Sequence, residues 1–468
     1  MNADASPLTP DELDRPRRIH VIGAGGAGMG AIATVLVAQG HAVTGSDLKD
    51  GPVPERLRAL GVPVAVGHDP ANVGDAEFVA VSTAIPDHNP ELRAAREAGI
   101  RVLRRADLLP ALCARRRTIA VAGTHGKTTT SSMLALILVE AGLDPSFVIG
   151  GDVNEVGSGA AWSEGEWLVI EADESDRTFL SLGAEIAIVT TVEPDHLETY
   201  GGDPARLAAA FATFAAAAPR CVVCADDPGA RALAETLDTA VTYGTAEGAD
   251  LRLVDVERWA DGIAFGVVWN GEHLGRIELP VPGLHNALDA GAAVAAALLA
   301  GAPFAAAVAA LGRFGGVARR FEWRGEADGV TFVDDYAHLP SEVKAAIAAA
   351  RDGEWRRVVV VFQPHRYSRT AALWRDFADA FTGADLLAIT GIYPAGERPR
   401  PGVTGKLVVD AVLEAHPWAS VAWLPTLEEV AAWLTARLRP GDLCLTLGAG
   451  DLTTLPDRFV SPVAEGVG

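Results

Sequence analysis

Short apolar runs alternate with longer segments of helical periodicity along most of the chain. Near the N-terminus, the run at 19–22 precedes a helical segment at 29–39 and a second run at 42–45. Continuous apolar runs are typical of parallel strands covered by helices on both faces. The alternation recurs in three blocks and predicts three α/β domains. These domains are expected at residues 17–112, 113–315 and 316–468.

In the second block, three apolar runs each end in polar residues. They lie at 119–121, 167–170 and 186–192. Ligands of parallel sheets bind outside the carboxyl ends of the strands, so we expect the three polar segments to converge. Residues 250–280 instead alternate and contain the turn signals Asp-Gly and Asn-Gly, which predict a small antiparallel appendage.

The third block repeats strand and helix, with strands expected at 330–333, 358–362, 386–390 and 443–447. Before it, residues 290–311 carry no charge and are mostly alanine. Gly301 and Pro303 interrupt this stretch, so we expect two buried helices there and not a membrane span.

Composition narrows the class of protein. The 468 residues are 49% hydrophobic and 21% charged, a composition typical of globular proteins. The net charge of −22 argues against nucleic acid or an anionic membrane as partners. Residues 1–16 lack the features of a signal peptide. Four cysteines are too few for a disulfide framework. Cys221 and Cys224 lie in an apparent strand, so we expect a core role and a cytoplasmic location.

The stretch GTHGKTTT at 123–130 lies between an apolar run and a helical segment. Such a turn directs backbone N–H groups and a helix N-terminus at one point, which suits a phosphate group. Lys127 adds a cation and Thr128 a hydroxyl group for Mg²⁺, which predicts a nucleoside triphosphate site. The alternative is a chance glycine-rich turn before a helix.

A second glycine-rich turn, GAGGAG at 23–28, follows the first apolar run, and Ser46-Asp47 ends the next strand. This pattern matches the dinucleotide fingerprint, in which a pyrophosphate meets a helix N-terminus. The loop at 82–86 again follows a strand. The pattern does not specify which nucleotide binds.

Acidic and histidine residues follow the other two strands of the second block. Glu171 ends a strand beside the phosphate loop, where a nucleotide-site acid would hold Mg²⁺; the alternative is a solvated acidic loop with Asp173, Glu174 and Asp176. His196 is either a ligand of a second metal ion or a hydrogen-bonded loop histidine.

Two clusters of the third block could bind anions. Arg366 and Arg369 lie in one loop after a strand, and the pair at 319–320 lies at the junction with the second block. The forked guanidinium group of arginine binds carboxylates and phosphates, so both clusters are candidate anion sites. The alternative for each is a solvated basic patch. The segment 334–338 precedes Pro340, a predicted first helical residue; capping explains part of this cluster.

With these motifs assembled, the chain resembles the Mur ligases over about residues 17–455. The resemblance rests on GAGGAGMGAIA with a following GSD, GTHGKTTT, EADESD, a later DH, GLHNALDA, RRFE, DDYAH and FQPHRYSRT. It implies a Rossmann-like UDP-substrate domain, a central P-loop ATPase-like parallel sheet with a small antiparallel appendage, and a C-terminal Rossmann-like α/β domain.

The resemblance further implies an ATP-dependent ligase that joins L-alanine to the carboxylate of UDP-N-acetylmuramate through an acyl phosphate. This is an early cytoplasmic step of peptidoglycan synthesis, on which cell wall, cell shape and cell division depend. The expected cofactors are ATP and two Mg²⁺ ions. A monomer or weak homodimer is expected, with small-molecule substrates, no nucleic acid and no membrane insertion.

Residue roles follow from the same resemblance, motif by motif. Lys127, His196 and His338 are expected to be catalytic, and Thr128, Glu171 and His196 to hold metal. The expected ATP-binding residues are Gly123, Thr124, His125, Gly126, Lys127, Thr128, Thr129, Asn286, Arg319, Arg320, Asp334 and Asp335. The UDP-substrate set is Gly23, Gly25, Gly26, Gly28, Ser46, Asp47, Thr83, Ala84 and Ile85, and the amino-acid set is Tyr336, His338, Arg366 and Arg369.

Two departures and three rivals qualify the resemblance. The family often has a second histidine where Leu339 stands and an alanine where Pro194 stands. A tripeptide-recycling ligase with the same muramyl substrate is a close rival, although Ser175 favours the alanine-adding activity. A nicotinamide-dependent oxidoreductase would leave the phosphate loop at 123–130 unexplained. A non-catalytic nucleotide-binding regulator would not need the complete set of charged residues.

Overall fold

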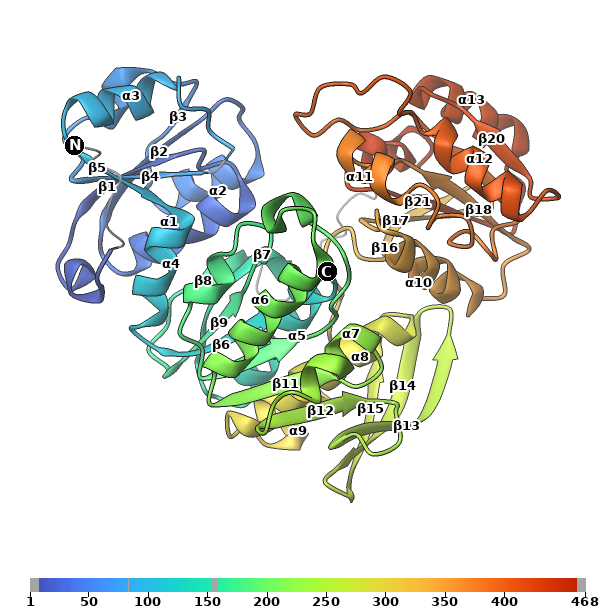
Figure 1. Cartoon of the computed structure of the whole chain (residues 1–468), viewed down its shortest axis with the longest axis horizontal. Coiled ribbons are helices and arrows are strands. Elements are labelled where there is room, and N and C mark those ends of the chain that lie inside the picture. Colours follow the sequence, from blue (N-terminus) through green and yellow to red (C-terminus); the bar gives the residue numbers. More distant parts are fainter. Residues whose placement is uncertain (1–7, 83, 154–157, 461–468) are drawn as a thin grey trace. The chain divides into compact units, whose positions relative to one another are not determined.

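The computed structural model describes residues 8–82, 84–153 and 158–460 (Figure 1). The chain forms two compact units. Unit 1 contains residues up to 255 together with 266–277 and 288–314, and unit 2 contains 256–265, 278–287 and the chain from 315 onward. Three β-sheets, each drawn from one of the three predicted segments, give the mixed α/β fold that the sequence predicts.

The first sheet contains five parallel strands in the order β3-β2-β1-β4-β5. The glycine-rich turn joins β1 to α1, as the fingerprint predicts, and β2 extends two residues beyond the predicted strand, to Asp47. The strands are β1 Arg18–Ile22, β2 Ala42–Asp47, β3 Val64–Val66, β4 Phe78–Val81 and β5 Arg101–Arg104, and the helices are α1 Ala27–Ala38, α2 Pro52–Ala59, α3 Pro90–Glu97 and α4 Arg105–Cys113.

The second sheet has ten strands in the order β15-β14-β13-β12-β11-β10-β6-β9-β7-β8. β6 lies between β10 and β9 and is parallel to both, so the three polar segments leave neighbouring strands at one edge, as predicted. β10 ends at Val189, three residues before the predicted end. The strands up to β12 are β6 Arg117–Ala122, β7 Ser146–Val153, β8 Ser158–Ala161, β9 Trp167–Glu171, β10 Ile186–Val189, β11 Arg220–Cys224 and β12 Ala240–Gly244.

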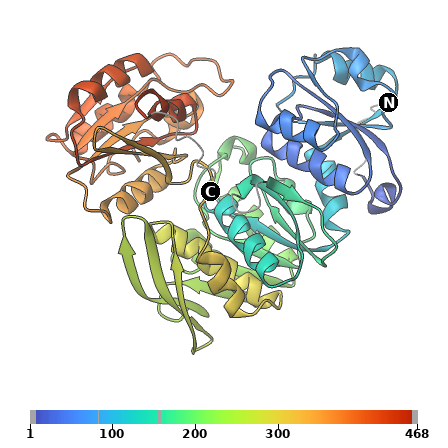
Figure 2. The same ribbon diagram turned by 180° about the vertical axis from the view of Figure 1, so that it is seen from behind.

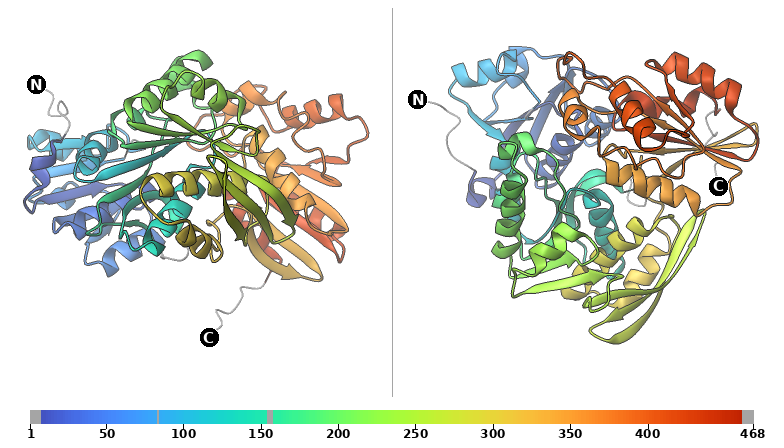
Figure 3. Two further views of the ribbon diagram at one scale, coloured as in Figure 1. Left: turned by 90° about the horizontal axis from the view of Figure 1, so that it is seen from below. Right: turned by 45° about the vertical axis from the view of Figure 1, so that its right-hand side comes forward.

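The predicted antiparallel appendage continues this sheet and does not form a separate one. β13 Leu251–Trp259, β14 Gly262–Trp269 and β15 Glu272–Leu279 are neighbours in the sheet, and two-residue turns join them. Turns this short connect antiparallel strands. Figure 3 shows the three as long, twisted strands in yellow-green.

The alanine-rich stretch forms two helices, as predicted: α8 Leu284–Leu299 and α9 Phe304–Leu311. α9 packs beside α5 Lys127–Glu140 (Figure 2), and nearly every side chain in the middle of α5 is buried. Within the described part of the chain, no helix is both long and apolar enough to cross a membrane. The remaining helices of the central segment are α6 Pro204–Ala217 and α7 Pro228–Ala234.

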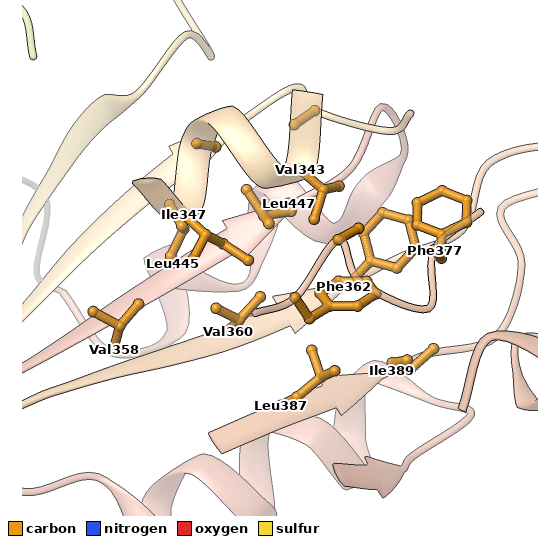
Figure 4. Close-up of a cluster of buried hydrophobic side chains, with 14 of the residues drawn as sticks. Val343, Ile347, Val358, Val360, Phe362, Phe377, Leu387, Ile389, Leu445 and Leu447 are labelled. Carbon is orange, nitrogen blue, oxygen red and sulfur yellow. The ribbon is translucent and has the colours of Figure 1, made fainter. Parts of the chain in front are cut away.

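Unit 2 contains a six-stranded sheet in the order β16-β17-β21-β18-β19-β20, in which β16 is antiparallel to β17. Figure 4 shows its core, where Val343 and Ile347 of α10 meet Val360 and Phe362 of β18. The strands are β16 Glu322–Ala327, β17 Val330–Asp335, β18 Arg357–Phe362, β19 Leu386–Ile389, β20 Val421–Trp423 and β21 Asp442–Leu447, and the helices are α10 Pro340–Arg351, α11 Tyr367–Leu373, α12 Lys406–Ala415 and α13 Leu427–Arg437.

Local sequence explains where several helices begin. Proline is the first residue of α3, α6, α7 and α10, where its missing N–H group would have no helical partner anyway. Asn89, Asp203 and Asp227 accept hydrogen bonds from the first turns of α3, α6 and α7. The prediction that Pro340 begins a helix is therefore confirmed.

Candidate active site

The phosphate-loop motif forms the turn between β6 and α5 in unit 1. Gly126, with φ of 77°, caps α5, and Gly123 has φ of 141°. A Cβ atom on Gly123 would clash with Thr190, and one on Gly126 would clash with Asp289 of α8. Both glycines are therefore required, because each has a positive φ and each lies too close to a neighbouring residue to carry a Cβ atom. The turn that they form places the N-terminus of α5 at the end of β6.

Lys127 is held over this turn by backbone and acidic groups. Its Nζ donates to Gly123 O at 2.5 Å and to Glu174 Oε1 at 3.1 Å. Burial opposes the charged lysine, but the carboxylates of Glu174, Asp173 and Glu171 raise its pKa above the ordinary value. Burial raises the pKa of Glu174, although Lys127 opposes the shift. The lysine therefore stays protonated beside the turn.

Thr128 and Glu171 converge on one point. Thr128 Oγ1 donates to Glu171 Oε2 at 3.0 Å, and the Gly150 N–H group donates to the same oxygen at 2.7 Å. A hydroxyl and a carboxylate oxygen are the hard ligands that Mg²⁺ prefers, so this pair fits the ion. Among the described residues, no group of three or more histidine, cysteine or acidic side chains could hold a metal ion.

The other side chains of the loop contact the segment after β10. Thr124 Oγ1 donates to Glu193 O at 3.2 Å, and the His125 N–H group donates to Thr191 Oγ1 at 2.9 Å. His196 has φ of 50° and lies 3.3 Å from Asp195 Oδ2. Thr129 is buried in the first turn of α5. The assignment of His196 to a second metal ion remains a prediction.

The N-terminal glycine loop is closed by Asp47. Gly25 N donates to Asp47 Oδ2 at 2.9 Å, and Gly26 caps α1, of which Gly28 is the second residue. Gly23 has φ of 82° and approaches Ser82 and Ile85, whose N–H group donates to Ser82 O at 3.1 Å. Ala84 N donates to Ser82 Oγ at 3.3 Å. Thr83 lies outside the described residues.

Ser46, predicted to face the UDP substrate, is fully buried. Its Oγ donates to Glu91 Oε2 at 2.5 Å, and Glu91 also accepts from His68 Nδ1 at 3.0 Å and Asn72 Nδ2 at 2.6 Å. His20 Nε2 lies 3.6 Å from the same carboxylate. The hydroxyl group of Ser46 thus belongs to an internal network, and the expected contact of Ser46 with the UDP substrate stays a prediction.

Burial raises the pKa of Glu91, but the hydrogen bonds from His20, Ser46 and Asn72 outweigh it and bring that pKa down to about 2. Glu91 is therefore an ionised carboxylate inside the first sheet's domain. Sequence reasoning missed it, since an acid in a helix's first turn is ordinary; only the surrounding His20 and His68 mark it.

In unit 2, the ring of Tyr336 contacts two arginines. The guanidinium carbons of Arg319 and Arg320 lie 4.9 and 5.1 Å from the centre of its ring. Arg319 Nε also donates to Asp334 Oδ2 at 3.3 Å, and Arg319 Nη2 donates to Gly448 O at 2.6 Å. The junction arginines and the DDYAH motif therefore form one cluster, which the sequence predicted only as separate candidates.

The two aspartates of this cluster are buried in their own domain. Asp334 accepts from Thr446 Oγ1 at 2.6 Å and Thr453 Oγ1 at 2.7 Å. Asp335 accepts from the N–H groups of Phe321 and Ala337 at 2.7 Å. Burial raises the pKa of Asp335 to about 6 against the opposing effect of Arg320. Both carboxylates brace the loop before α10, so their contact with nucleotide stays a prediction.

His338 is fixed by its own loop and by α10. Its Nδ1 lies 3.0 Å from Tyr336 O and 3.3 Å from Glu342 Oε2, and its ring lies edge-on to His365 at 5.6 Å. Glu342 also lies 3.8 Å from Arg320. Sequence reasoning missed Glu342, although its position two residues after Pro340 is typical of an N-terminal capping acid.

The arginine loop after β18 joins the same cluster. Arg369 Nη1 lies 2.9 Å from His365 Nδ1, and His365 stacks on Tyr393 at 5.8 Å. Arg366 has φ of 67° at the start of α11. The structure therefore brings His338 and the arginine loop together, and their contact with the amino acid stays a prediction.

Asn286 lies in the first turn of α8, where Nδ2 donates to Pro282 O at 2.6 Å. The side chain is 4% exposed, and unit 2 contains this part of the helix.

The cysteines at 221 and 224 are buried in β11, as predicted, and burial raises their pKa values to about 12 and 11.

Three family models match the chain in succession. The Mur ligase family catalytic domain matches residues 18–117, the Mur ligase middle domain matches 121–297, and the Mur ligase glutamate ligase domain matches 319–450. Together these models extend over most of the chain and correspond to the segments that form the three sheets.

Relatives of established name are similar over nearly their whole length. The UDP-N-acetylmuramate–L-alanine ligase of Nitratidesulfovibrio vulgaris is 46% identical over 453 residues, which cover 96% of this chain and 99% of the relative. The protein of the same name from Pelotomaculum thermopropionicum is 46% identical over 458 residues, which cover 97% of this chain and 99% of that relative.

Solved structures agree with this comparison. The UDP-N-acetylmuramate-alanine ligase of Thermotoga maritima has a TM-score of 0.80 and 29% identity, covering 95% of this chain and 98% of that one. The murein peptide ligase of Psychrobacter arcticus has a TM-score of 0.70 at 24% identity, and the match covers 97% of this chain and 100% of that one. The second likeness concerns the fold alone.

Proposed function

Because the chain belongs to the Mur ligase family, we propose that it joins L-alanine to the carboxylate of UDP-N-acetylmuramate in a reaction driven by ATP. The names of the relatives at 46% identity support this substrate pair. The observation that carries the proposal is the convergence of Lys127, Thr128 and Glu171 at the carboxyl edge of β6 and β9. A nicotinamide-dependent dehydrogenase has no use for this arrangement.

The first chemical step is phosphoryl transfer. A carboxylate oxygen of the sugar attacks the γ-phosphorus of ATP, the bond to the bridging oxygen breaks, and an acyl phosphate and ADP result. Negative charge gathers on the transferred oxygens, and the ammonium group of Lys127 is placed to stabilise it. The N-terminus of α5 and the N–H groups of the loop add to that field.

Thr128 and Glu171 are the residues that would hold Mg²⁺, and the ion would neutralise phosphate charge in the transition state. His196 is the proposed ligand of a second ion. In this assignment Glu174 keeps Lys127 in place and does not bind metal, since its carboxylate is 2% exposed and pairs with the lysine at 3.0 Å.

The second step is attack by the amine of L-alanine on the acyl carbon, after which inorganic phosphate leaves from the tetrahedral intermediate. The amine must lose its protons to form the amide. We assign the base to His338, because a proton on Nδ1 shared with Tyr336 O makes Nε2 the basic nitrogen. Arg366 and Arg369 would bind the alanine carboxylate.

The first sheet is proposed to bind the UDP-sugar through the glycine loop and Asp47, with Ala84 and Ile85 beside it. Gly123 to Thr129, Asn286, the arginines at 319 and 320 and the aspartates at 334 and 335 are the proposed ATP set. A cytoplasmic monomer or weak homodimer fits substrates that are all small and soluble. The tripeptide-recycling activity is not favoured, since the relatives at 46% identity over nearly the whole chain are named for the alanine-adding activity.

The test is phosphate release with ATP, Mg²⁺ and UDP-N-acetylmuramate, with L-alanine, glycine, L-serine or the tripeptide as acceptor. We expect L-alanine to give the highest kcat/KM. The Lys127→Ala variant should lose at least about 10²-fold in turnover, because the charge nearest the transferred phosphoryl group is gone. Preference for the tripeptide, or turnover without any acceptor amine, would overturn the assignment.

A further inference from the structure

Arg105, the first residue of α4, lies beside the N-terminal glycine turn and beside the acidic segment that follows β9. Its Nη1 lies 3.7 Å from Asp173 Oδ2, and its Nη2 lies 3.5 Å from Glu171 O. A Cβ atom on Gly28, in the N-terminal glycine turn, would lie 3.8 Å from the same Nη1. The guanidinium group is thus beside the proposed UDP-sugar loop on one side and the proposed phosphoryl-transfer site on the other.

The contacts of Arg105 are weak for a partly buried arginine. A guanidinium group has five N–H donors, and strong bonds to carboxylates are 2.7–2.9 Å long, whereas both polar contacts that the described residues give Arg105 are 3.5 Å or longer. Its side chain is 23% exposed. By comparison, Arg115 of the same unit lies 2.6 Å from Asp14. Arg105 therefore has donors available for a ligand.

The charges around Arg105 are arranged for an anion that spans the two loops. Asp173 lies 3.7 Å from Arg105 and also attracts the ammonium group of Lys127. A row of Lys127, Asp173 and Arg105 thus connects the phosphate loop to Gly28. An oxyanion at Arg105 would replace long contacts with short, charge-assisted ones.

We propose that Arg105 binds an oxyanion of the UDP-sugar, either its diphosphate or the carboxylate that reacts. The inference rests on the proposed function and adds a substrate-binding residue to it. Through Arg105 the enzyme would fix the sugar between the loop that holds the nucleotide and the site where ATP is cleaved. This placement would favour attack by the carboxylate over attack by water.

The test is isothermal titration of Arg105→Gln with UDP, UDP-N-acetylglucosamine and UDP-N-acetylmuramate, each without ATP. We expect UDP-N-acetylmuramate to bind at least about tenfold more weakly than it binds the wild type. Equal weakening of all three ligands would identify the diphosphate as the bound group, because all three carry it. Weakening of UDP-N-acetylmuramate alone would identify the carboxylate.

Unchanged affinity for all three ligands would overturn the proposal. So would a loss of UDP-N-acetylmuramate affinity that Asp173→Asn restores in the double variant, because Arg105 would then act only by neutralising that acid. The wild type's turnover with L-alanine is measured separately, so a failure of the proposed ligase activity is distinguishable from a failure of this site.

Two controls keep the comparison specific. Arg105→Lys keeps a cation at the site and should recover part of the lost affinity. Arg93→Gln removes a 65% exposed arginine of α3 that is paired with Glu97, and it should bind all three ligands as the wild type does. Thermal unfolding of each variant confirms that the fold is intact before affinity is compared.

Discussion

At the scale of single residues, Glu91 shows how a buried charge can be satisfied. Four donors surround its two oxygens: the Ser46 hydroxyl, the His68 ring, the Asn72 amide and the Asp69 N–H group. A carboxylate with this many hydrogen bonds stays ionised even when fully buried. The network ties the end of β2 to α3 and so fixes Asp47, which closes the glycine loop.

Because of this network, the free energy of unfolding should depend on pH in the acidic range. The pKa of Glu91 in the folded protein is about 2, below its ordinary value of 4.5, so its stabilisation is present above pH 4.5 and lost as the pH falls toward 2. The full loss is about 3 kcal/mol, at 1.36 kcal/mol per pKa unit. Urea unfolding of the wild type and Glu91→Gln at several pH values measures it.

We expect Glu91→Gln to be less stable at neutral pH and to show a shallower decline below pH 4.5. Glu97→Gln is the matched control, because Glu97 lies in the same helix and its side chain is 73% exposed. Parallel declines in the wild type and Glu91→Gln would show that this carboxylate does not cause the pH dependence.

At the scale of elements, the turn from β6 to α5 depends on contact with a distant helix. Gly126 begins α5 with a positive φ, and Asp289 of α8 occupies the space where any Cβ atom would lie. The phosphate loop is therefore shaped by its own glycines and also by a helix more than 150 residues later in the chain.

Gly126→Ala should damage ATP binding more than backbone strain alone predicts. The left-handed conformation costs alanine about 1–2 kcal/mol, and the clash with Asp289 adds to this by displacing the loop. Gly142→Ala is the matched control, since Gly142 has φ of 71° with no atom within 4 Å of its added Cβ.

Chemical denaturation and ATP titration separate the two contributions. We expect Gly142→Ala to lose about 1 kcal/mol of stability with normal ATP affinity. Gly126→Ala should lose more stability and bind ATP roughly tenfold or more weakly, because the N–H groups of the loop no longer converge. Equal effects of the two substitutions would show that the approach of Asp289 is unimportant.

At the scale of the whole molecule, the proposed ATP residues are divided between the two compact units. Lys127 and Thr128 belong to unit 1, whereas Asn286 and Arg319 belong to unit 2. One nucleotide that contacts both sets must restrict the motion of the units relative to each other. The proposed UDP-sugar residues, by contrast, all lie in unit 1.

X-ray scattering tests this expectation directly. Addition of a non-hydrolysable ATP analogue with UDP-N-acetylmuramate should lower the radius of gyration. UDP alone, whose proposed site lies within unit 1, should leave it unchanged. A radius of gyration that is the same with and without the nucleotide analogue would mean that ATP does not bring the two units together.

Sequence reasoning located the strands and turns that carry chemistry, because glycine loops, apolar runs and strand-end acids are local signals. It placed Thr128 and Glu171 at one site and predicted the two alanine-rich helices and the start of α10. It assigned Ser46 to the UDP-sugar but gave no sign that the hydroxyl group donates to the buried carboxylate of Glu91. It also missed Arg105, whose contacts with Glu171 and Asp173 are remote in the chain. It missed Glu342 because an acid in the first turn of a helix is ordinary in sequence.

The order of glycines, apolar runs and charged residues is enough to specify three α/β segments and the family, because periodicity and turn chemistry act over a few neighbouring residues. Partnerships between distant side chains are decided only in three dimensions. Lys127 pairs with Glu174 and Arg105 approaches Gly28 because parallel sheets bring remote strand ends to one edge. Asp289 shapes the phosphate loop because α8 packs against it. No local pattern encodes those distances.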